Sequence, residues 1–200
     1  MAFLVNKKEI PFLITNLDKL TVLGKYIIPC IIKYRNDLVL NYLSNESRHL
    51  DLGCGQGYLV INSPCNSVIG IDKTGGFGKK SRGAELTALP GFDLEKPFEF
   101  EDNSFDIVTS VALIEHISNI RFFFTEVWRV LKNEGKFLFT TPLPLIEKMA
   151  PLLDNGSSQL SGNNIKSEHK GYFNKKLIVE LIDSKFNILL YKKFMLGLNQ

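Results

Sequence analysis

Four short apolar stretches recur along the chain and indicate buried β-strands. They are HLDLG at 49–53, VIGID at 68–72, FDIVTSV at 105–111 and KFLFTT at 136–141. The segments between them are long enough to cross back over a sheet, as neighbouring parallel strands require. The pattern therefore predicts a parallel α/β sheet.

Apolar positions at helical spacing predict helices between and around these strands. One helix is expected from about Pro29 to Leu43, where the spacing is kept by Ile28, Ile31, Ile32, Arg35, Leu38 and Tyr42. The clearest helix lies in NIRFFFTEVWRVLKNEG at 119–135, with Asn119 suited to cap its start and Gly135 placed to end it. We interpret its aromatic residues as core.

The C-terminal third of the sequence is less regular. Residues 142–173 are expected to contain a short helix and a polar loop rich in glycine, asparagine and serine, which we interpret as a mobile insertion around 154–170. NKKLIVELIDSK at 174–185 predicts a helix, and FNILLYKKF at 186–194 predicts a late strand.

Composition narrows the class of protein. A chain of 200 residues suits one domain, and its formal net charge of +3 lacks the basic footprint of tight nucleic-acid binding. Cys30, Cys54 and Cys65 lack metal-ligand spacing, so we expect reduced thiols in a cytoplasmic protein. The N-terminus does not read as a signal peptide, and Gly24, Lys25 and Pro29 break the one long apolar stretch below membrane-spanning length.

The stretch HLDLGCGQGYLV at 49–60 carries the candidate chemistry. Gly53, Gly55 and Gly57 follow a predicted strand, where glycine lets the backbone approach a nucleotide-like ligand closely. Their G-x-G-x-G spacing places Tyr58 where the dinucleotide fingerprint needs glycine, which argues against NAD. Asp51 is unfavourable beside a pyrophosphate and favourable beside an ammonium group.

Four stretches in this order resemble the class I S-adenosylmethionine-dependent methyltransferases, particularly the small-molecule enzymes. They are LDLGCGQG, VIGIDK, DLEKPFEFEDNSFDIV with LIEHI, and RVLKNEGKFLFTTP, and the resemblance covers about Arg48 to Pro142. It implies a Rossmann-like, doubly wound, mostly parallel sheet of about six to seven strands in a three-layer sandwich. It also implies one domain: a helical segment at 1–45, a cofactor-binding core at 46–142, a substrate-side insertion at 143–175 and a C-terminal helix and strand at 176–200.

The resemblance places the glycine stretch against the cofactor. Asp51 is implied near the methionine amino group of S-adenosylmethionine, and Gly53, Cys54, Gly55 and Gly57 in the close turn. Cys54 has no base near it in the sequence, so we interpret it as packing and not as a nucleophile.

The resemblance implies two further cofactor contacts. Asp72, with Lys73 beside it, ends the second strand and is implied to accept hydrogen bonds from the ribose hydroxyls. Asp93 and Leu94 match the position at the adenine edge. The simpler interpretations are an exposed turn acid for Asp72 and a loop acid or helix cap for Asp93.

Transfer of a methyl group to a hydroxyl requires a base, and histidine suits that task. His116 in LIEHI is implied to line the substrate site, unless Glu115 and His116 brace the next helix. His169 is the second candidate base, with a solvated loop histidine as the alternative, and His49 is interpreted as structural or surface. The family includes the ubiquinone-biosynthesis O-methyltransferases, which carry a metal-binding acid three residues before the position of Glu115. Ala112 occupies that position here, so we expect no metal.

Two segments depart from the family pattern. YLVINSPCNS at 58–67 is shorter than the usual helix after the glycine turn, and Pro64 is expected to end it early. KTGGFGKKSRG at 73–83 replaces the usual crossover helix and reads either as a surface loop or as a clamp for an anionic substrate group.

These observations predict an S-adenosylmethionine-dependent methyltransferase that releases S-adenosylhomocysteine and acts on oxygen of a small molecule or glycan precursor. Nitrogen and carbon acceptors stay open. The alternatives are a non-catalytic methyltransferase-like binding or scaffold module and, from another class, an NAD-dependent oxidoreductase. Apolar residues near the N-terminus would serve either a homodimer or a cover over the cofactor.

Overall fold

The structure is a computed structural model that describes residues 22–73, 85–141, 175–182, 186–189, 194–195 and 198–199. The short helix expected within 142–173, the insertion at 154–170, His169 and most of the glycine-rich basic segment at 73–83 lie outside these residues. Within the described part of the chain, no helix is long and apolar enough to cross a membrane.

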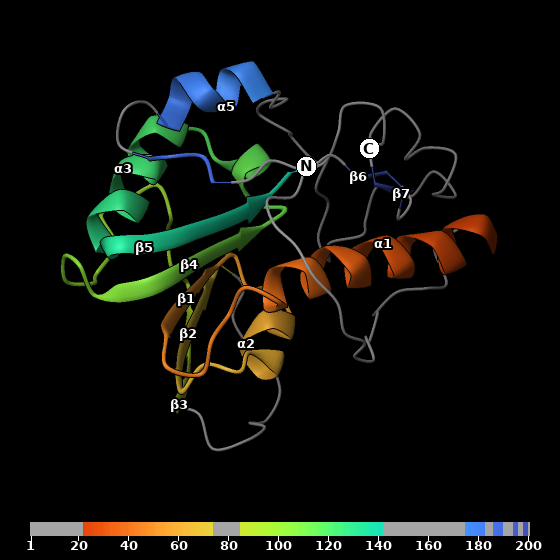
Figure 1. The fold of residues 1–200 in the computed structure, drawn as a ribbon, viewed down its shortest axis with the longest axis horizontal. Helices are drawn as coiled ribbons and strands as arrows, with labels where there is room; N and C mark the ends of the chain where they lie inside the picture. Colours follow the sequence, from red (N-terminus) through yellow and green to blue (C-terminus); the bar gives the residue numbers. More distant parts are fainter. Residues whose placement is uncertain are drawn as a thin grey trace.

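The core of the fold is a five-stranded parallel sheet in the order β3-β2-β1-β4-β5 (Figure 1). Its strands are β1 (Arg48–Leu52), β2 (Ser67–Asp72), β3 (Glu85–Pro90), β4 (Phe105–Val111) and β5 (Leu131–Thr140). The four predicted strands and the parallel α/β class are therefore confirmed. The described residues supply five strands to this sheet, below the expected six to seven.

The sequence did not predict β3. Its residues, ELTALP, include glutamate, alanine and proline, which are depleted in strands. The strand forms through pairing with β2, from Ser67 opposite Glu85 to Asp72 opposite Pro90.

Helices cover both faces of the sheet (Figure 1). α1 (Val22–Leu40) and α2 (Tyr58–Asn62) lie on one side, and α3 (Ile120–Val130) and α5 (Lys175–Ile182) on the other. The first side buries a cluster that includes Val39, Leu59, Val60, Val68 and Ile107. The second side buries a larger cluster that includes Leu50, Val108, Phe123, Val127 and Ile178. Alternate residues of the inner strands therefore face opposite helical layers.

The helix predicted at Pro29–Leu43 begins earlier. α1 starts at Val22 and continues through Pro29 to Leu40, so the expected start at the proline is wrong. Proline removes one backbone donor from the ladder. The helix nevertheless continues through Pro29, and its sequence is apolar on both sides of the proline.

The clearest predicted helix has the expected start and a different end. The Asn119 side chain accepts a hydrogen bond from the Phe122 N–H at 3.2 Å, as a cap should. α3 ends at Val130, not near Gly135, because Leu131 already pairs with Phe105 of β4.

A register shift within β5 explains the glycine. The pairing of β4 with β5 is irregular between Phe105 and Ile107, and Glu134 has a φ of 64° there. A Cβ on Gly135 would lie 2.8 Å from the carbonyl oxygen of Lys132. Close backbone approach therefore requires this glycine, and it does not cap a helix.

The remaining elements follow the sequence in part. α2 is as short as expected, with Ser63 in extended conformation just before Pro64. α5 confirms the late helix. The strand expected over 186–194 is wrong for 186–189, which have no regular structure, whereas β6 (Phe194–Met195) pairs with β7 (Leu198–Asn199) in an antiparallel ladder.

Candidate functional site

The carboxyl ends of the parallel strands meet at one edge of the sheet, and the predicted cofactor residues gather there. β2 and β4 lie on opposite sides of β1, so the strand order reverses at β1. Ligands of open α/β sheets bind in the crevice outside the strand ends at such a reversal. The turn after β1 lies at this position.

The backbone of that turn requires glycine. Gly53, Gly55 and Gly57 have φ angles of 69°, 51° and 74°, in the left-handed region that glycine adopts without a Cβ penalty. The N–H groups of Gly53 and Cys54 both donate to the Ile71 carbonyl, at 2.8 and 3.1 Å. The turn is therefore fixed to the end of β2.

The surroundings of the turn differ between Gly53 and Gly55. A Cβ on Gly53 would lie 2.8 Å from Leu113 Cδ1, so a side chain from the loop after β4 closes this side. A Cβ on Gly55 would meet no atom within 4 Å. The turn thus offers open space above Gly55, where a ligand can approach the backbone.

Asp72, which ends β2, points toward the glycine turn. Its Oδ2 accepts a hydrogen bond of 2.9 Å from the Gly55 N–H. The Asp72 side chain is half-buried, and Lys73 beside it is exposed. The structure brings Asp72 to the glycine turn, and contact of Asp72 and Lys73 with a ribose stays a prediction.

Asp51 lies beneath the turn and is almost fully buried, with 2% of its surface exposed. Its Oδ1 accepts a hydrogen bond of 2.6 Å from the Thr109 hydroxyl on β4. The pKa of Asp51 is raised to about 7, mainly because the carboxyl group is buried. The bond from Thr109 lowers this pKa, and the charge of Asp72 contributes to raising it. A cation bound beside Asp51 would offset the cost of its buried charge.

Cys54 lies in the turn as a partly buried thiol. Burial raises its pKa, and the charges of Asp51 and Asp72 raise it further. Because the thiolate is the nucleophilic form, this environment keeps Cys54 inert. The interpretation of Cys54 as a packing residue of the turn agrees with these surroundings.

Asp93 and Leu94 lie in the turn that follows β3. The Asp93 carboxylate accepts a hydrogen bond from the Glu95 N–H at 3.1 Å and pairs with Lys96 at 3.4 Å. The bond from Glu95 is the main cause that lowers the pKa of Asp93. The side chain thus braces its own turn, as the simpler interpretation expects, while Leu94 is buried in the core.

The loop after β4 forms the opposite wall of this edge. Glu115 is 2% exposed, whereas His116 is exposed to solvent. The Ser118 N–H donates to Glu95 Oε1 at 2.8 Å, which joins this wall to the turn after β3. The structure therefore brings His116 to the same edge as the glycine turn.

Arg35 of α1 faces the buried carboxylate of this wall. Burial lowers the pKa of Arg35, and the charge of Glu115 opposes that shift. The Arg35 Nε is buried without a hydrogen-bond partner. α1 is also tied to the start of α2, directly after the glycine turn, because Tyr58 donates its hydroxyl proton to Asp37 at 3.2 Å.

Sequence reasoning missed the residues that support the site. Thr109 holds Asp51, and Leu113 covers Gly53. The sequence itself held a signal for Thr109. Strands of a parallel sheet that are buried on both faces are usually apolar, so a polar residue within such a strand needs a hydrogen-bond partner. No spacing rule connects Leu113 with Gly53, since their contact depends on the order of the strands.

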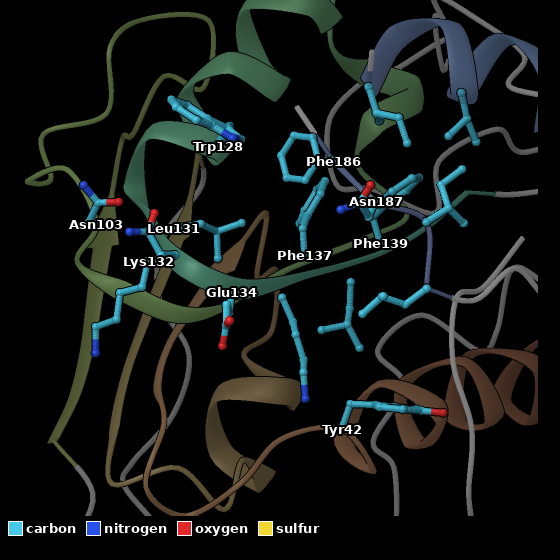
Figure 2. Close-up of a pocket in the computed structure, with 18 residues that line it drawn as sticks. Tyr42, Asn103, Trp128, Leu131, Lys132, Glu134, Phe137, Phe139, Phe186 and Asn187 are labelled. Carbon is cyan, nitrogen blue, oxygen red and sulfur yellow. The ribbon is translucent and has the colours of Figure 1, made fainter. Parts of the chain in front are cut away.

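A cavity lies elsewhere, along β5 (Figure 2). It has a volume of about 440 Å³ and lies between β5, α5 and residues 186–189. Phe137, Phe139 and Phe186 line it, and Lys132 and Glu134 lie at its polar end (Figure 2). No residue of the glycine turn lines this cavity, so it is separate from the site described above.

Comparisons with known proteins identify the family. Residues 50–139 match the family model described as a methyltransferase domain. The chain is 35% identical over 163 residues to a protein of Encephalitozoon cuniculi whose name describes it as a methyltransferase. This match covers 74% of each chain. It is 33% identical over 115 residues to the uncharacterized methyltransferase YcgJ of Bacillus subtilis, covering 53% of this chain and 42% of YcgJ.

The crystal structure of YcgJ is similar over 58% of this chain and 56% of that chain, with 27% identity and a TM-score of 0.46. The chain thus spans about half the length of YcgJ and about three quarters of the Encephalitozoon cuniculi protein. The matched region begins within β1 and ends within β5, so it contains the glycine turn, Asp72 and the wall after β4. The chain therefore belongs to the class I S-adenosylmethionine-dependent methyltransferases.

Proposed function

We propose that this chain transfers the methyl group of S-adenosylmethionine to an oxygen atom of a small molecule or glycan precursor. The observation that carries the choice of oxygen is His116, an exposed histidine on the wall that faces the glycine turn. A hydroxyl acceptor must lose a proton during transfer, and a neutral imidazole is suited to take it.

The residues of the edge fit the cofactor. The open space at Gly55 admits a ligand close to the backbone, and Asp72 offers a carboxylate whose orientation is fixed by the Gly55 N–H. Asp51 is a buried carboxylate close enough to Asp72 to feel its charge, an arrangement that favours a positively charged group. We assign Asp51 to the amino group, Asp72 to the ribose, and Asp93 and Leu94 to the adenine edge.

Bound S-adenosylmethionine supplies a methyl group on a positively charged sulfur. The part of this chain is to hold the cofactor at the glycine turn and the acceptor in line with the methyl group. His116 accepts the proton of the acceptor hydroxyl. Glu115 is buried and precedes His116 in the sequence. Its negative charge interacts with the positive charge of Arg35, and this interaction holds the loop that carries His116.

Relatives differ in the atom that their names give as methyl acceptor. A glycine/sarcosine/dimethylglycine N-methyltransferase of Actinopolyspora halophila is 30% identical over 129 residues, covering 56% of this chain and 22% of that protein. A sterol 4-C-methyltransferase of Caenorhabditis elegans is 29% identical over 109 residues, covering 48% and 31%. The test of the proposal must therefore include nitrogen and carbon acceptors.

The test measures formation of S-adenosylhomocysteine with acceptors that carry hydroxyl, amine or activated carbon groups, and locates the methyl group in each product by mass spectrometry. With a hydroxyl acceptor, His116→Ala should lower kcat by about 10²- to 10⁴-fold and leave the affinity for S-adenosylhomocysteine unchanged. Arg121→Ala, an exposed change on α3, is the matched control and should retain wild-type kcat. Turnover confined to amine acceptors, or wild-type turnover in His116→Ala, would contradict the proposal.

A further inference from the structure

Four polar side chains form a continuous hydrogen-bonded chain inside the sheet, beneath the glycine turn. Ser63 Oγ lies 3.2 Å from His49 Nδ1, and His49 Nε2 lies 2.8 Å from Thr109 Oγ1. Thr109 in turn donates to Asp51 Oδ1 at 2.6 Å. His49 and Thr109 are fully buried, which is unusual for the centre of a parallel sheet.

The register of the strands creates this chain. Asp51 of β1 stands directly opposite Thr109 of β4, and His49 stands opposite Ile107. His49 and Asp51 are two residues apart, so both side chains lie on the same face of β1. Ser63, which ends α2, completes the chain from above that face.

The protons of these four hydrogen-bonded side chains can be arranged in two ways, depending on whether Asp51 carries a proton. When Asp51 is a carboxylate, the Thr109 hydroxyl donates to it, so the Thr109 oxygen accepts from His49 Nε2–H and Nδ1 accepts from Ser63. When Asp51 carries a proton on Oδ1, Asp51 donates to Thr109, Thr109 donates to Nε2, and the imidazole proton moves to Nδ1. The three hydrogen bonds that join the four side chains are kept in both arrangements, because a neutral imidazole has one donor and one acceptor.

The charged groups around these four hydrogen-bonded side chains decide which of the two proton arrangements forms. Burial lowers the pKa of His49 to about 3, so the imidazole stays neutral and only its tautomer changes. The pKa of Asp51 is raised to about 7, because burial and the charge of Asp72 of β2 together outweigh the bond from Thr109, which lowers it. In the glycine turn the Cys54 thiol is neutral, because burial raises its pKa, and on β4 the facing residue is Thr109.

We infer that Ser63, His49 and Thr109 are positioning residues for Asp51, and that binding of a cationic amino group there fixes the chain in the carboxylate arrangement, with His49 as the Nε2–H tautomer. This inference rests on the proposed assignment of the cofactor's amino group to Asp51. A bound ammonium stabilises the carboxylate. The carboxylate holds the Thr109 hydroxyl, and Thr109 selects the tautomer of His49.

The first experiment observes the tautomer directly. Long-range proton–nitrogen correlation spectra of the ¹⁵N-labelled chain identify the His49 signals by their loss in His49→Phe. In the ligand-free protein, the tautomer should change from Nδ1–H to Nε2–H as pH rises from 6 to 8. Saturating S-adenosylhomocysteine should give the Nε2–H form across this range. A single tautomer under all these conditions would overturn the inference.

The second experiment measures the affinity for S-adenosylhomocysteine by calorimetry between pH 6 and 8. Linkage to one proton with a pKa of about 7 predicts an affinity about tenfold higher at pH 8 than at pH 6. Thr109→Val, which removes the hydroxyl at nearly constant shape, should move this rise to higher pH. Thr109→Ser keeps the hydroxyl and should restore the wild-type profile, whereas a merely structural role would give Val and Ser the same profile.

The outcomes separate this inference from the proposed assignment. If S-adenosylhomocysteine binds with no pH dependence and no effect on His49, while the tautomer of the free protein still changes with pH, the ammonium does not bind at Asp51. If the ligand binds with the expected pH dependence and the tautomer never changes, the assignment of the amino group to Asp51 holds. The inferred coupling between Asp51 and the tautomer of His49 is then wrong. Thermal unfolding of each variant shows that it is folded before its affinity is measured.

Discussion

At the scale of single residues, the site depends on carboxylates with different environments. Asp51 is buried and bonded to Thr109, whereas Asp72 is half-buried and bonded to the backbone of Gly55. The two side chains are suited to different ligand groups, since the first needs a compensating cation and the second offers a directed acceptor.

Asp72→Ala should weaken binding of S-adenosylhomocysteine by about 1–3 kcal/mol, because charge-assisted hydrogen bonds to the ribose are lost. Calorimetric titration measures this change. Glu101→Ala, an exposed acid outside this edge, is the charge-matched control and should bind as the wild type does. An unchanged dissociation constant in Asp72→Ala would remove Asp72 from the cofactor site.

Sequence and structure differ most clearly at this scale. The left-handed turn at Gly53, Gly55 and Gly57 was predictable, because a local motif determines it. The partner of Asp51 was not, because Thr109 is brought opposite by strand pairing across 58 residues of sequence. Asp93 illustrates a further limit, since a family position does not reveal that the side chain braces its own turn.

At the scale of elements, one arginine joins α3 to the loop before β4. Arg129 donates to both carboxylate oxygens of Glu126, at 3.0 and 2.8 Å, and to Asp102 at 2.7 Å. It also donates to the carbonyls of Phe98 and Phe100, at 2.8 and 2.7 Å. Its bond to Glu126 is the main cause that lowers the pKa of that carboxyl group.

Arg129→Ala should lower the free energy of unfolding by about 3 kcal/mol, because the largely buried Glu126 loses its partner. Urea unfolding measures the effect. Arg121→Ala removes an exposed arginine from the same helix and should change stability by less than about 0.5 kcal/mol. Equal effects of the two substitutions would show that the network around Arg129 contributes nothing specific.

Element boundaries show where the sequence pattern was insufficient. The start of α3 was predictable because the Asn119 cap is local. Its end was not, because residues 131–135 have a helix-compatible pattern and pairing of Leu131 with Phe105 decides their conformation. β3 escaped prediction for the same reason, since β2 determines its conformation.

At the scale of the whole molecule, two buried groups make opposite contributions to stability as pH changes. The folded pKa of Asp51 is raised to about 7, so the native state holds a proton that the unfolded chain has released, and stability falls as pH rises from about 4 to 7. The folded pKa of His49 is lowered to about 3, so the unfolded chain holds the extra proton and stability rises up to about pH 6.5.

The two contributions should nearly cancel between about pH 4.5 and 6.5, which leaves only a shallow dependence from this pair. His49→Phe should reveal the effect of Asp51, a loss relative to the wild type of about 1.4 kcal/mol per pH unit as pH rises. Asp51→Asn should reveal the effect of His49, a gain of similar slope. Urea unfolding of the three proteins across this range measures the slopes, and parallel profiles would show that neither group is perturbed as described.

The hydrogen bond between Gly55 and Asp72 also affects how fast a ligand can bind. Because the turn and its acceptor are joined during folding, the carboxylate does not have to search for its orientation when the cofactor arrives. The cost in conformational entropy at this end of the site is met before binding. Binding at the ribose end should therefore need no rearrangement of Asp72 during association. Differences in affinity among ligands that share this ribose should arise mainly from their dissociation rates.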